Sequence, residues 1–462
     1  MDRVITGWKR YMLVQPPILL VLIALSMSGA IFTNLIVYRT CISMKINETE
    51  CLLLNTNSSS KEAIKINSKV QPYASVILMS KSFVESIFPS VLSLFLGPWS
   101  DKYGRKPVIL SGYIGISLTF LLIAVMSDLN VSPWYFLIAY IPIGLLGGIY
   151  VLMLASLCYV TDMTNDSERA WHLAWIDALL NLGLLIGLLS GPLIFEEYGY
   201  TIVFSISTVL SIIATLYILL VVPEIVQRSS SGICKIFDCT LVKDLIDTCV
   251  KKRDGFDRLL VWCCITCLTI LLITMQGEIA IEYLFVSAQL GWTVKQYSNY
   301  VAINVVLGII GTLFGIKIMR NYAGMPEALL AATSVMSSLG GALVLAFTWQ
   351  SWHMYLSIFI TMFNGISKPM IRAILSKAVP VQDIGKVFSL ATSLETVLPF
   401  AAASLYTLLY TKYMPPLYPQ PVWFLSVTFY IITIIILIYI QVKIIKRNDI
   451  AYTSVTESDS AS

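Results

Sequence analysis

Eight ionisable side chains stand inside strongly apolar stretches of the sequence, where a charge is costly. They are Lys81, Glu85, Asp177, Glu278, Glu282, Lys368, Arg372 and Glu395. On insertion scales, a charge at the centre of a membrane helix costs about 2.5–3.5 kcal/mol. Charged side chains retained at that cost usually face a water-filled cavity or each other, and they bind solutes, ions or protons. These residues are therefore the candidate functional site.

Three pairs of these residues are spaced four apart, so a helix places each pair on one face. Lys81 and Glu85 fit either a structural ion pair that neutralises itself or part of a substrate site. Lys368 and Arg372 could attract an anionic substrate, although their long side chains could instead reach the membrane interface. We count all four as substrate-binding candidates and leave these alternatives open.

The other four candidates are acids. Glu278 and Glu282 are also four residues apart, and they repel each other if both are ionised. Either one is protonated, or a cation lies between them, or both lie in an outer vestibule. We count them with the substrate-binding candidates. Asp177 has no cation within four residues along its own helix, and Glu395 is similarly isolated; each fits a proton-coupling site or a structural hydrogen bond between helices.

The amino-acid composition indicates that these side chains are carried on membrane-spanning helices. Apolar residues make up 57% of the 462 residues and charged residues 13%, against about 45–50% and about 25% in soluble chains. A net charge of +4 gives no basic surface for nucleic acid. Only two histidines are present, and Cys263, Cys264 and Cys267 lie inside an apolar run, so the sequence predicts no metal site. No nucleophile–base pattern predicts an enzyme, so we expect no catalytic residues and no cofactor other than coupling protons.

Twelve apolar runs are each long enough to cross a bilayer, which takes about 20 residues as a helix. They cover residues 13–37, 73–96, 107–127, 134–160, 171–195, 200–222, 259–285, 298–319, 327–348, 353–376, 385–409 and 421–443. We predict an all-α membrane protein with twelve transmembrane helices in two six-helix halves. The N-terminal half is 1–222, the central linker 223–258, the C-terminal half 259–443 and the tail 444–462.

Positive charges predict that both termini, the linker and the tail are cytoplasmic. The linker carries seven Lys or Arg, whereas the loops near 128–133, 196–199 and 349–351 carry none. Cytoplasmic loops of membrane proteins carry the excess of these residues. The segment 38–72 is then one large outer loop, and the number of helices is even.

The outer loop contains chemistry that fits the outside of a cell. Asn47 and Asn57 begin glycosylation sequons there, and Asn130 begins a third outer sequon. Cys41 and Cys51 lie in the same oxidising loop. They either form a short disulfide or remain two free thiols.

The loop after the second apolar run carries a recognisable motif. It reads Gly97-Pro98-Trp99-Ser100-Asp101-Lys102-Tyr103-Gly104-Arg105-Lys106. This resembles the G-x-x-x-D-[RK]-x-G-R-[RK] signature of the major facilitator superfamily, and it falls in the expected loop. Gly97 permits a close approach of helices, and Gly104 permits a tight turn.

The charges of this motif predict a cytoplasmic gate. Asp101, Arg105 and Lys106 can make charge-assisted bonds at the helix ends. Asp162, at the end of the fourth run, is the natural partner for Arg105, and Arg169 opens the fifth run. We interpret these residues as a latch that holds the cytoplasmic side shut in the outward-open state. The alternative is topology charge alone.

Small residues recur at helical spacing in the fifth and eighth runs. They are Gly183, Gly187 and Gly191 in the fifth run, and Gly308, Gly311 and Gly315 in the eighth. Such spacing lets membrane helices approach closely. We therefore interpret both sets as packing positions rather than ligand sites.

Four stretches resemble the proton-coupled folate transporter family. They are Ile371–Lys377, Gly385–Phe388, Leu394–Thr396 and Arg169–Gly183. The resemblance implies proton-coupled import of organic anions. It implies a proton-coupling role for Asp177 and a substrate-handling role for Arg372. The resemblance also implies a solute that is folate-like, a steroid conjugate or a bacterial cell-wall fragment. The seventh run has no histidine and the loop after it no cysteine, and these departures from the family count against folate itself.

The sequence therefore predicts a secondary active transporter that moves an organic anion with protons by alternating access. Its partners are the solute and the lipid bilayer, without nucleic acid, and we expect it to work as a monomer. The alternatives are a proton-independent exchanger or uniporter, and a substrate sensor that does not transport. The plasma membrane is expected, with the endolysosomal membrane as the alternative because Tyr452–Val455 fits a tyrosine-based sorting signal.

The orientation is testable by glycosylation. Glycosidase treatment should lower the apparent mass of the chain, and Asn47→Gln combined with Asn57→Gln should remove most of that shift, because sequons are modified only on the non-cytosolic side. Asn165→Gln is the matched control, since this sequon stands in an expected cytosolic loop. If Asn165 proves to carry the glycan, the predicted orientation is inverted.

Overall fold

The computed structural model describes residues 13–56, 60–163, 166–224, 257–322, 324–379, 384–413 and 418–460. Within these ranges every regular element is a helix, and each of the twelve predicted runs coincides with helical segments. Eight of these helices are individually long and apolar enough to cross a membrane. The prediction of an all-helical membrane protein is confirmed.

The helices form two compact units. The first unit contains the described residues within 1–243, 279–305 and 396–416, and the second contains those within 244–278, 306–395 and 417–462. The proposed boundary between sequence halves falls mainly in residues 225–256, outside the described ranges. The division into an N-terminal and a C-terminal half remains a prediction.

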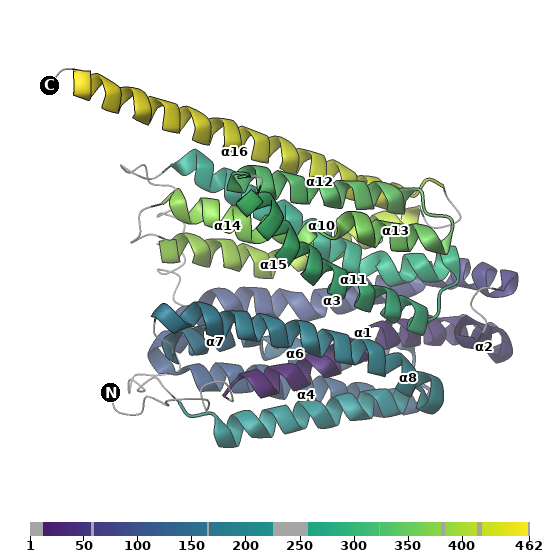
Figure 1. Cartoon of the computed structure of the whole chain (residues 1–462). Coiled ribbons are helices and arrows are strands. Elements are labelled where there is room, and N and C mark those ends of the chain that lie inside the picture. The colour runs from purple at the N-terminus through teal and green to yellow at the C-terminus, as the bar shows by residue number, and fades with distance from the viewer. Residues whose placement is uncertain are drawn as a thin grey trace. The chain divides into compact units, whose positions relative to one another are not determined.

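The first unit is built around three long helices that lie side by side (Figure 1). Its elements are α1 (Gln15–Ser43), α2 (Glu48–Thr56), α3 (Lys61–Tyr103), α4 (Arg105–Asp128), η2 (Pro133–Tyr135), α5 (Phe136–Ala139), α6 (Ile141–Leu145), α7 (Gly148–Met163) and α8 (Asp166–Val221). Helix α8 packs along both α1 and α4. Its 56 residues comprise two helical segments, the fifth and sixth runs, which meet at Gly199. The φ of 77° at Gly199 interrupts the helical path there.

The glycines of α8 allow close packing against α1. A Cβ at Gly191 would lie 2.5 Å from the backbone oxygen of Met27, and one at Gly183 would lie 2.9 Å from the Cβ of Leu22. Real side chains do not approach so closely. The predicted packing role of these glycines is confirmed.

The fourth apolar run is not one helix, as the sequence suggested, but a series of short pieces from η2 to α7. Pro142 lacks a backbone N–H and falls in the first turn of α6. Gly147 and Gly148 then adopt φ values of 93° and 54°, which end the helical path before α7. The breaks therefore follow from residues that disfavour a continuous helix.

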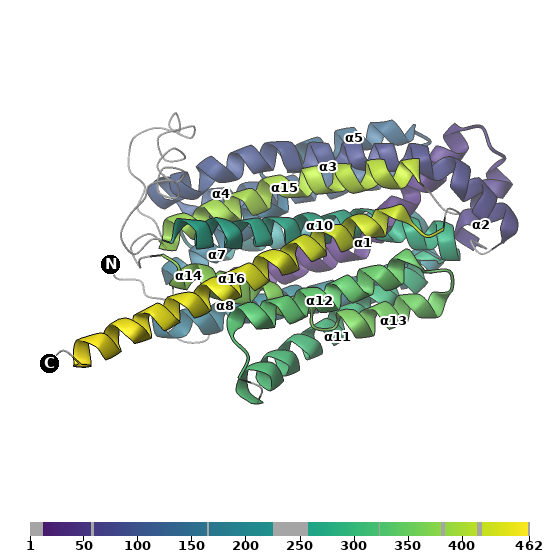
Figure 2. The same ribbon diagram turned by 90° about the horizontal axis from the view of Figure 1, so that it is seen from above.

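The second unit packs its helices around α12, as Figure 2 shows for α12 and α16. Its elements include α10 (Arg258–Leu290), α11 (Val294–Ile316), η4 (Lys317–Tyr322), α12 (Glu327–Ala346), α13 (Ser351–Thr361), η5 (Asn364–Ile366), α14 (Ser367–Lys377), α15 (Ile384–Lys412) and α16 (Pro421–Ser460). Parts of α10, α11 and α15 belong to the first unit. Helix α16 continues through most of the predicted tail.

The tenth apolar run is interrupted in its middle, between α13 and α14. Backbone groups freed in an apolar medium need partners, and Ser334 of α12 supplies them. Its hydroxyl donates to the carbonyl oxygen of Phe363 at 2.7 Å and accepts from the N–H of Ser367 at 3.1 Å. The carbonyl oxygen of Asn364 lies 3.2 Å from the same hydroxyl. Buried Ser334 therefore stabilises the break.

The glycines of α11 face the same break. A Cβ at Gly315 would lie 2.7 Å from the side chain of Ile366, and Gly311 stands directly against the backbone of Met362. Gly308 is looser, since its nearest neighbour, Asn364, is 3.9 Å away. These contacts confirm the predicted packing role for Gly311 and Gly315.

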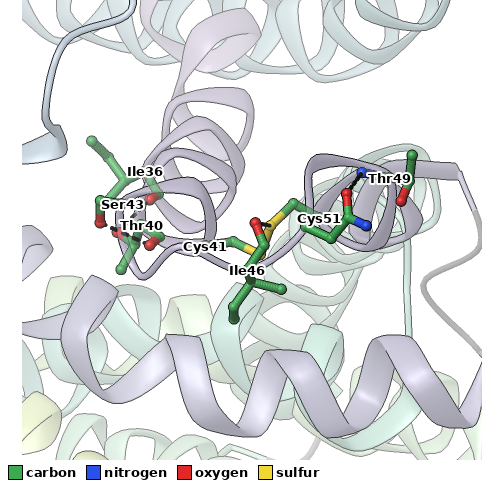
Figure 3. The surroundings of a disulfide bond; sticks show 8 residues. Ile36, Thr40, Cys41, Ser43, Ile46, Thr49 and Cys51 are labelled. Carbon is green, nitrogen blue, oxygen red and sulfur yellow. Dashed lines mark hydrogen bonds between the residues drawn. A yellow bond between two sulfur atoms is a disulfide. The ribbon is translucent and has the colours of Figure 1, made fainter.

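Cys41 and Cys51, in the segment predicted to be the outer loop, form a disulfide, which decides between the two alternatives left open by the sequence (Figure 3). Cys41 lies in the last turn of α1 and Cys51 in α2, with Cα atoms 5.9 Å apart. Asn47, between them, is exposed and accepts a hydrogen bond from the N–H of Thr49. Asn130 is exposed too, and its Oδ1 accepts from Arg39 at 2.6 Å. Asn57 lies outside the described residues.

Candidate functional site

The charged pair of α3 lies in the first unit and neutralises itself. Lys81 Nζ lies 2.8 Å from Glu85 Oε2 and 4.8 Å from the ring centre of Tyr140. The pair lines a cavity of about 110 Å³ together with Thr119, whose buried hydroxyl has no hydrogen-bond partner in the structure as described. At about 30 Å³ per molecule, this cavity holds a few waters. It is too small for an organic solute.

The cations of α14 lie in the second unit, immediately after the break in the tenth run. Lys368 Nζ lies 3.3 Å from the sulfur of Met275 on α10. Glu278, one turn further along α10, accepts a hydrogen bond from Tyr430 of α16 at 3.4 Å. Arg372 follows Lys368 by one turn on α14. The second unit therefore brings Lys368 to the stretch of α10 that carries Glu278.

This arrangement favours an anion. The N-terminus of a helix carries a partial positive charge, and α14 begins at Ser367, one residue before Lys368. Transporters commonly bind solutes at the ends of such discontinuous helices. Lys368 therefore lies at the helix N-terminus, and Arg372 follows one turn later.

Glu282 lies in the first unit and has different partners from Glu278. Its carboxylate accepts hydrogen bonds from Tyr297 at 3.2 Å and from Tyr300 at 3.1 Å. Among the described residues it pairs with phenols and with no Lys or Arg. Glu278 and Glu282 therefore accept hydrogen bonds from different tyrosine hydroxyls.

The first unit also contains a network of uncharged polar side chains that the sequence analysis missed. Asn34 of α1 donates to Tyr283 of α10 at 3.0 Å and accepts from Tyr200 of α8. Gln71 of α3 donates to the carbonyl oxygen of Leu284 and accepts from Tyr410 of α15, both at 2.9 Å. The only sequence signal was the presence of amide side chains inside or beside apolar runs.

A second pair extends this network along α3 and α10. Asn67 of α3 donates to Ser287 of α10 at 3.1 Å. Asn67 is 3% exposed and Gln71 is fully buried. A buried polar group left without its partner costs about 1–3 kcal/mol. The network therefore fixes the positions of α1, α3, α8 and the described ends of α10 and α15 in the first unit.

The predicted cytoplasmic gate is only partly described. Gly97 and Asp101 lie on α3, Asp162 on α7 and Arg169 on α8, but their side chains are outside the description. The side chains of Asp177 on α8 and Glu395 on α15 are outside it as well. The pairing of Asp162 with Arg105 and the two proton-coupling sites remain predictions.

The structure adds Glu224 to this gate. One carboxylate oxygen accepts from the backbone N–H of Arg105 at 3.1 Å, and the other accepts from that of Lys106 at 3.2 Å. The Lys106 ammonium in turn donates to the carbonyl oxygen of Leu219 at 2.9 Å. A carboxylate at a helix N-terminus contributes about 0.3–1 kcal/mol. Glu224 therefore ties the start of α4 to the end of α8.

Two separate features of this contact require a glycine at position 104. Its φ is 121°, which disfavours any side chain, and a Cβ there would lie 2.5 Å from the carboxylate of Glu224. Sequence reasoning had identified the turn, but it had not identified the acid that approaches it. The signal was Pro223-Glu224 directly after the sixth run.

Comparison with known proteins assigns the family. The model of the Major Facilitator Superfamily matches residues 77–404, which is more than half of the chain. The chain belongs to the major facilitator superfamily. It is therefore a multi-pass membrane transporter of this superfamily, and the match includes the loop motif that first indicated it.

Named relatives agree with this assignment. The chain is 28% identical over 415 residues to the probable peptidoglycan muropeptide transporter SLC46 of Drosophila melanogaster, covering 87% of this chain and 80% of the fly protein. It is 22% identical over 399 residues to the proton-coupled folate transporter of Rattus norvegicus, covering 86% and 85% of the two chains. These relatives are named transporters, not enzymes.

Solved structures support the fold alone. The human organic anion transporter MFSD10 aligns with a TM-score of 0.61 at 14% identity, covering 93% of this chain and 99% of that one. The peptide transporter PepTSo aligns with a TM-score of 0.61 at 12% identity, covering 95% and 98%. The predicted major facilitator fold is confirmed.

The contact of Glu224 with α4 gives a testable prediction. Glu224→Gln should lower the stability of the purified protein by about 1 kcal/mol, because it removes the charge that faces the helix N-terminus. Glu197→Gln is the matched control, since this acid of α8 is exposed. Thermal unfolding of both variants beside the natural protein measures the difference. Equal unfolding midpoints for the two variants would contradict a capping role.

Proposed function

We propose that the chain is a proton-coupled symporter of an organic anion that works by alternating access. The observation that carries the proposal is the position of Lys368 and Arg372 in the first two turns of α14, directly after the break that Ser334 stabilises. Two cations at the positive end of a discontinuous helix suit a negatively charged solute.

Arg372 is proposed to hold the anionic group of the solute. Its guanidinium keeps its charge at every physiological pH and can bind a carboxylate through two parallel hydrogen bonds. Lys368 adds a second cation on the same face. The names of the relatives, which mention a folate, a muropeptide and an organic anion, support a solute that is folate-like, a steroid conjugate or a cell-wall fragment.

Proton coupling is assigned to carboxyl groups within the membrane. Asp177 is the first candidate, and Glu395 is the second. Protonation of such a group removes its charge, so that the loaded carrier can reorient, and release of the proton on the other side restores it. The name of the rat relative supports proton coupling. Protons are the only coupling ion in this proposal, and no cofactor is required.

Alternating access requires a closure on each side of the membrane. We assign the outer closure to the amide and tyrosine network around Asn34 and Gln71, which lies in the first unit toward the disulfide end of α1. We assign the cytoplasmic closure to Asp101, Arg105 and Asp162. The two closures would alternate, because a carrier open on both sides could not couple its solute to protons.

The remaining assignments follow the charge pattern. Both termini are proposed to be cytoplasmic, with the protein in the plasma membrane and working as a monomer. The exposed Asn47 and the disulfide beside it support an outer location for the segment after α1.

The proposal predicts distinct defects for the two key residues. Asp177→Asn should abolish accumulation of solute against its gradient but leave exchange partly intact, because the variant cannot release a proton. Arg372→Ala should weaken binding of the anion at every pH, and Arg372→Lys should restore it only in part, because a lysine cannot make the two parallel bonds. Uphill uptake into proteoliposomes with an imposed proton gradient, beside exchange without one, measures both.

The outcomes separate coupling from transport itself. If Asp177→Asn still accumulates solute, Asp177 is not the coupling site, and Glu395 or Glu282 is tested in the same assay. If the natural protein exchanges solute but ignores the proton gradient, it is a proton-independent exchanger. If no organic anion is bound or moved by the natural protein, the proposed function is wrong.

A further inference from the structure

A cavity of about 470 Å³ lies within the second unit, away from the charged residues discussed above. It is lined by the starts of α10 and α12, by η4, by the last turn of α14, by the middle of α16 and by the turn before α12. Its volume lies within the range of about 300–1,000 Å³ that is usual for small-molecule sites. The N–H of Asp257, just before α10, donates to the carbonyl oxygen of Ala378, just after α14, at 3.2 Å, and this bond fixes one wall.

The lining of the cavity carries three cations and two acids. Lys377 Nζ lies 2.6 Å from Glu327 Oε1, and Lys443 Nζ lies 2.5 Å from Asp257 Oδ1. Arg320 is more distant, at 3.9 Å from the same Glu327 oxygen. Glu327 therefore shares its charge between two cations, and the lining has an excess of positive charge.

The exposure of these groups leaves the cations available. The side chains of Lys377 and Arg320 are 67% and 55% exposed, whereas that of Glu327 is 18% exposed. Exposed ion pairs contribute little to stability, about 0–1 kcal/mol. An anion that enters the cavity could therefore recruit both cations without a large loss elsewhere.

Two further groups face the same space. Helix α12 begins at Glu327 after Pro326, which provides no side-chain cap, and Pro326, Glu327 and Ala328 all line the cavity. The uncapped start of α12 is therefore part of the cavity wall. Gln441 also lines the cavity, and its buried Oε1 has no hydrogen-bond partner within the described ranges. A hydroxyl group would satisfy that oxygen.

We propose that this cavity binds a phosphate monoester carried on a hydroxylated group. The phosphate would lie among Lys377, Lys443 and Arg320 near the start of α12, since helix N-termini and lysines both bind phosphate. A neighbouring hydroxyl would donate to Gln441. The headgroup of a phosphoinositide and a soluble polyol phosphate share this chemistry. The site uses none of the residues assigned to the transported solute.

Binding to the purified full-length protein tests the proposal with two probes. One probe is inositol monophosphate in solution, and the other is phosphatidylinositol monophosphate in phosphatidylcholine vesicles, with pure phosphatidylcholine as the blank. Lys377→Gln combined with Lys443→Gln should weaken binding on the order of tenfold or more, at about 1 kcal/mol per cation near a membrane surface. Lys317→Gln combined with Lys446→Gln is the matched control. These two substitutions remove the same amount of charge, but at exposed lysines that do not line the cavity.

Glu327→Gln distinguishes a ligand site from a structural ion pair. It frees Lys377 and Arg320, so it should strengthen binding of whichever probe binds the natural protein. If those cations serve only to hold Glu327, this variant should lose stability and gain no binding. Binding of the vesicle probe alone would identify a lipid headgroup, and binding of the soluble probe would identify a free phosphate.

Three results would overturn the proposal. They are no binding of either probe to the natural protein, equal losses in the cavity variant and its matched control, and unchanged or weaker binding by folded Glu327→Gln, whether or not its unfolding midpoint falls. None of them bears on transport of the organic anion, which is measured separately by uptake.

Discussion

An apolar membrane leaves no free partner for a polar group, so every interruption of a helix must be satisfied by the protein itself. Ser334 meets this requirement at the break between α13 and α14 by bonding the backbone of Phe363 and Ser367. The break in turn allows a new helix to begin in the middle of the tenth run. Lys368 therefore stands in the first turn of α14 and Arg372 in the second, and the candidate anion site depends on one buried hydroxyl.

The same requirement explains the other polar contacts. The carboxylate of Glu224 satisfies two backbone N–H groups at the start of α4. Gln71 uses both ends of its amide, one toward a backbone carbonyl and one toward Tyr410. Each of these hydrogen bonds contributes little net free energy to folding, whereas a buried group left without its partner destabilises the protein by more. They therefore suit positions that must be well defined when closed and must separate when the carrier changes state.

The sequence alone predicted those features of the structure whose signal lies within a short stretch of the chain. Hydropathy located all twelve helical runs, helical spacing paired Lys81 with Glu85, and the short separation of Cys41 and Cys51 suggested their disulfide. It was insufficient where partners are uncharged or distant along the chain. Ser334 is one serine among many, and the link between Gln71 and Tyr410 spans most of the chain. The break after Thr361 likewise depends on packing against Ser334, which no short pattern reveals.

The central claim is that the cations of α14 face water inside the membrane. Labelling of a cysteine introduced at position 368 measures this directly. The background keeps the disulfide but lacks the other seven cysteines, namely Cys158, Cys234, Cys239, Cys249, Cys263, Cys264 and Cys267. The account predicts that Lys368→Cys reacts in intact membranes with a charged, membrane-impermeant thiol reagent, and that a transported anion slows the reaction. Reaction with a lipid-soluble reagent alone, unaffected by any anion, would contradict it.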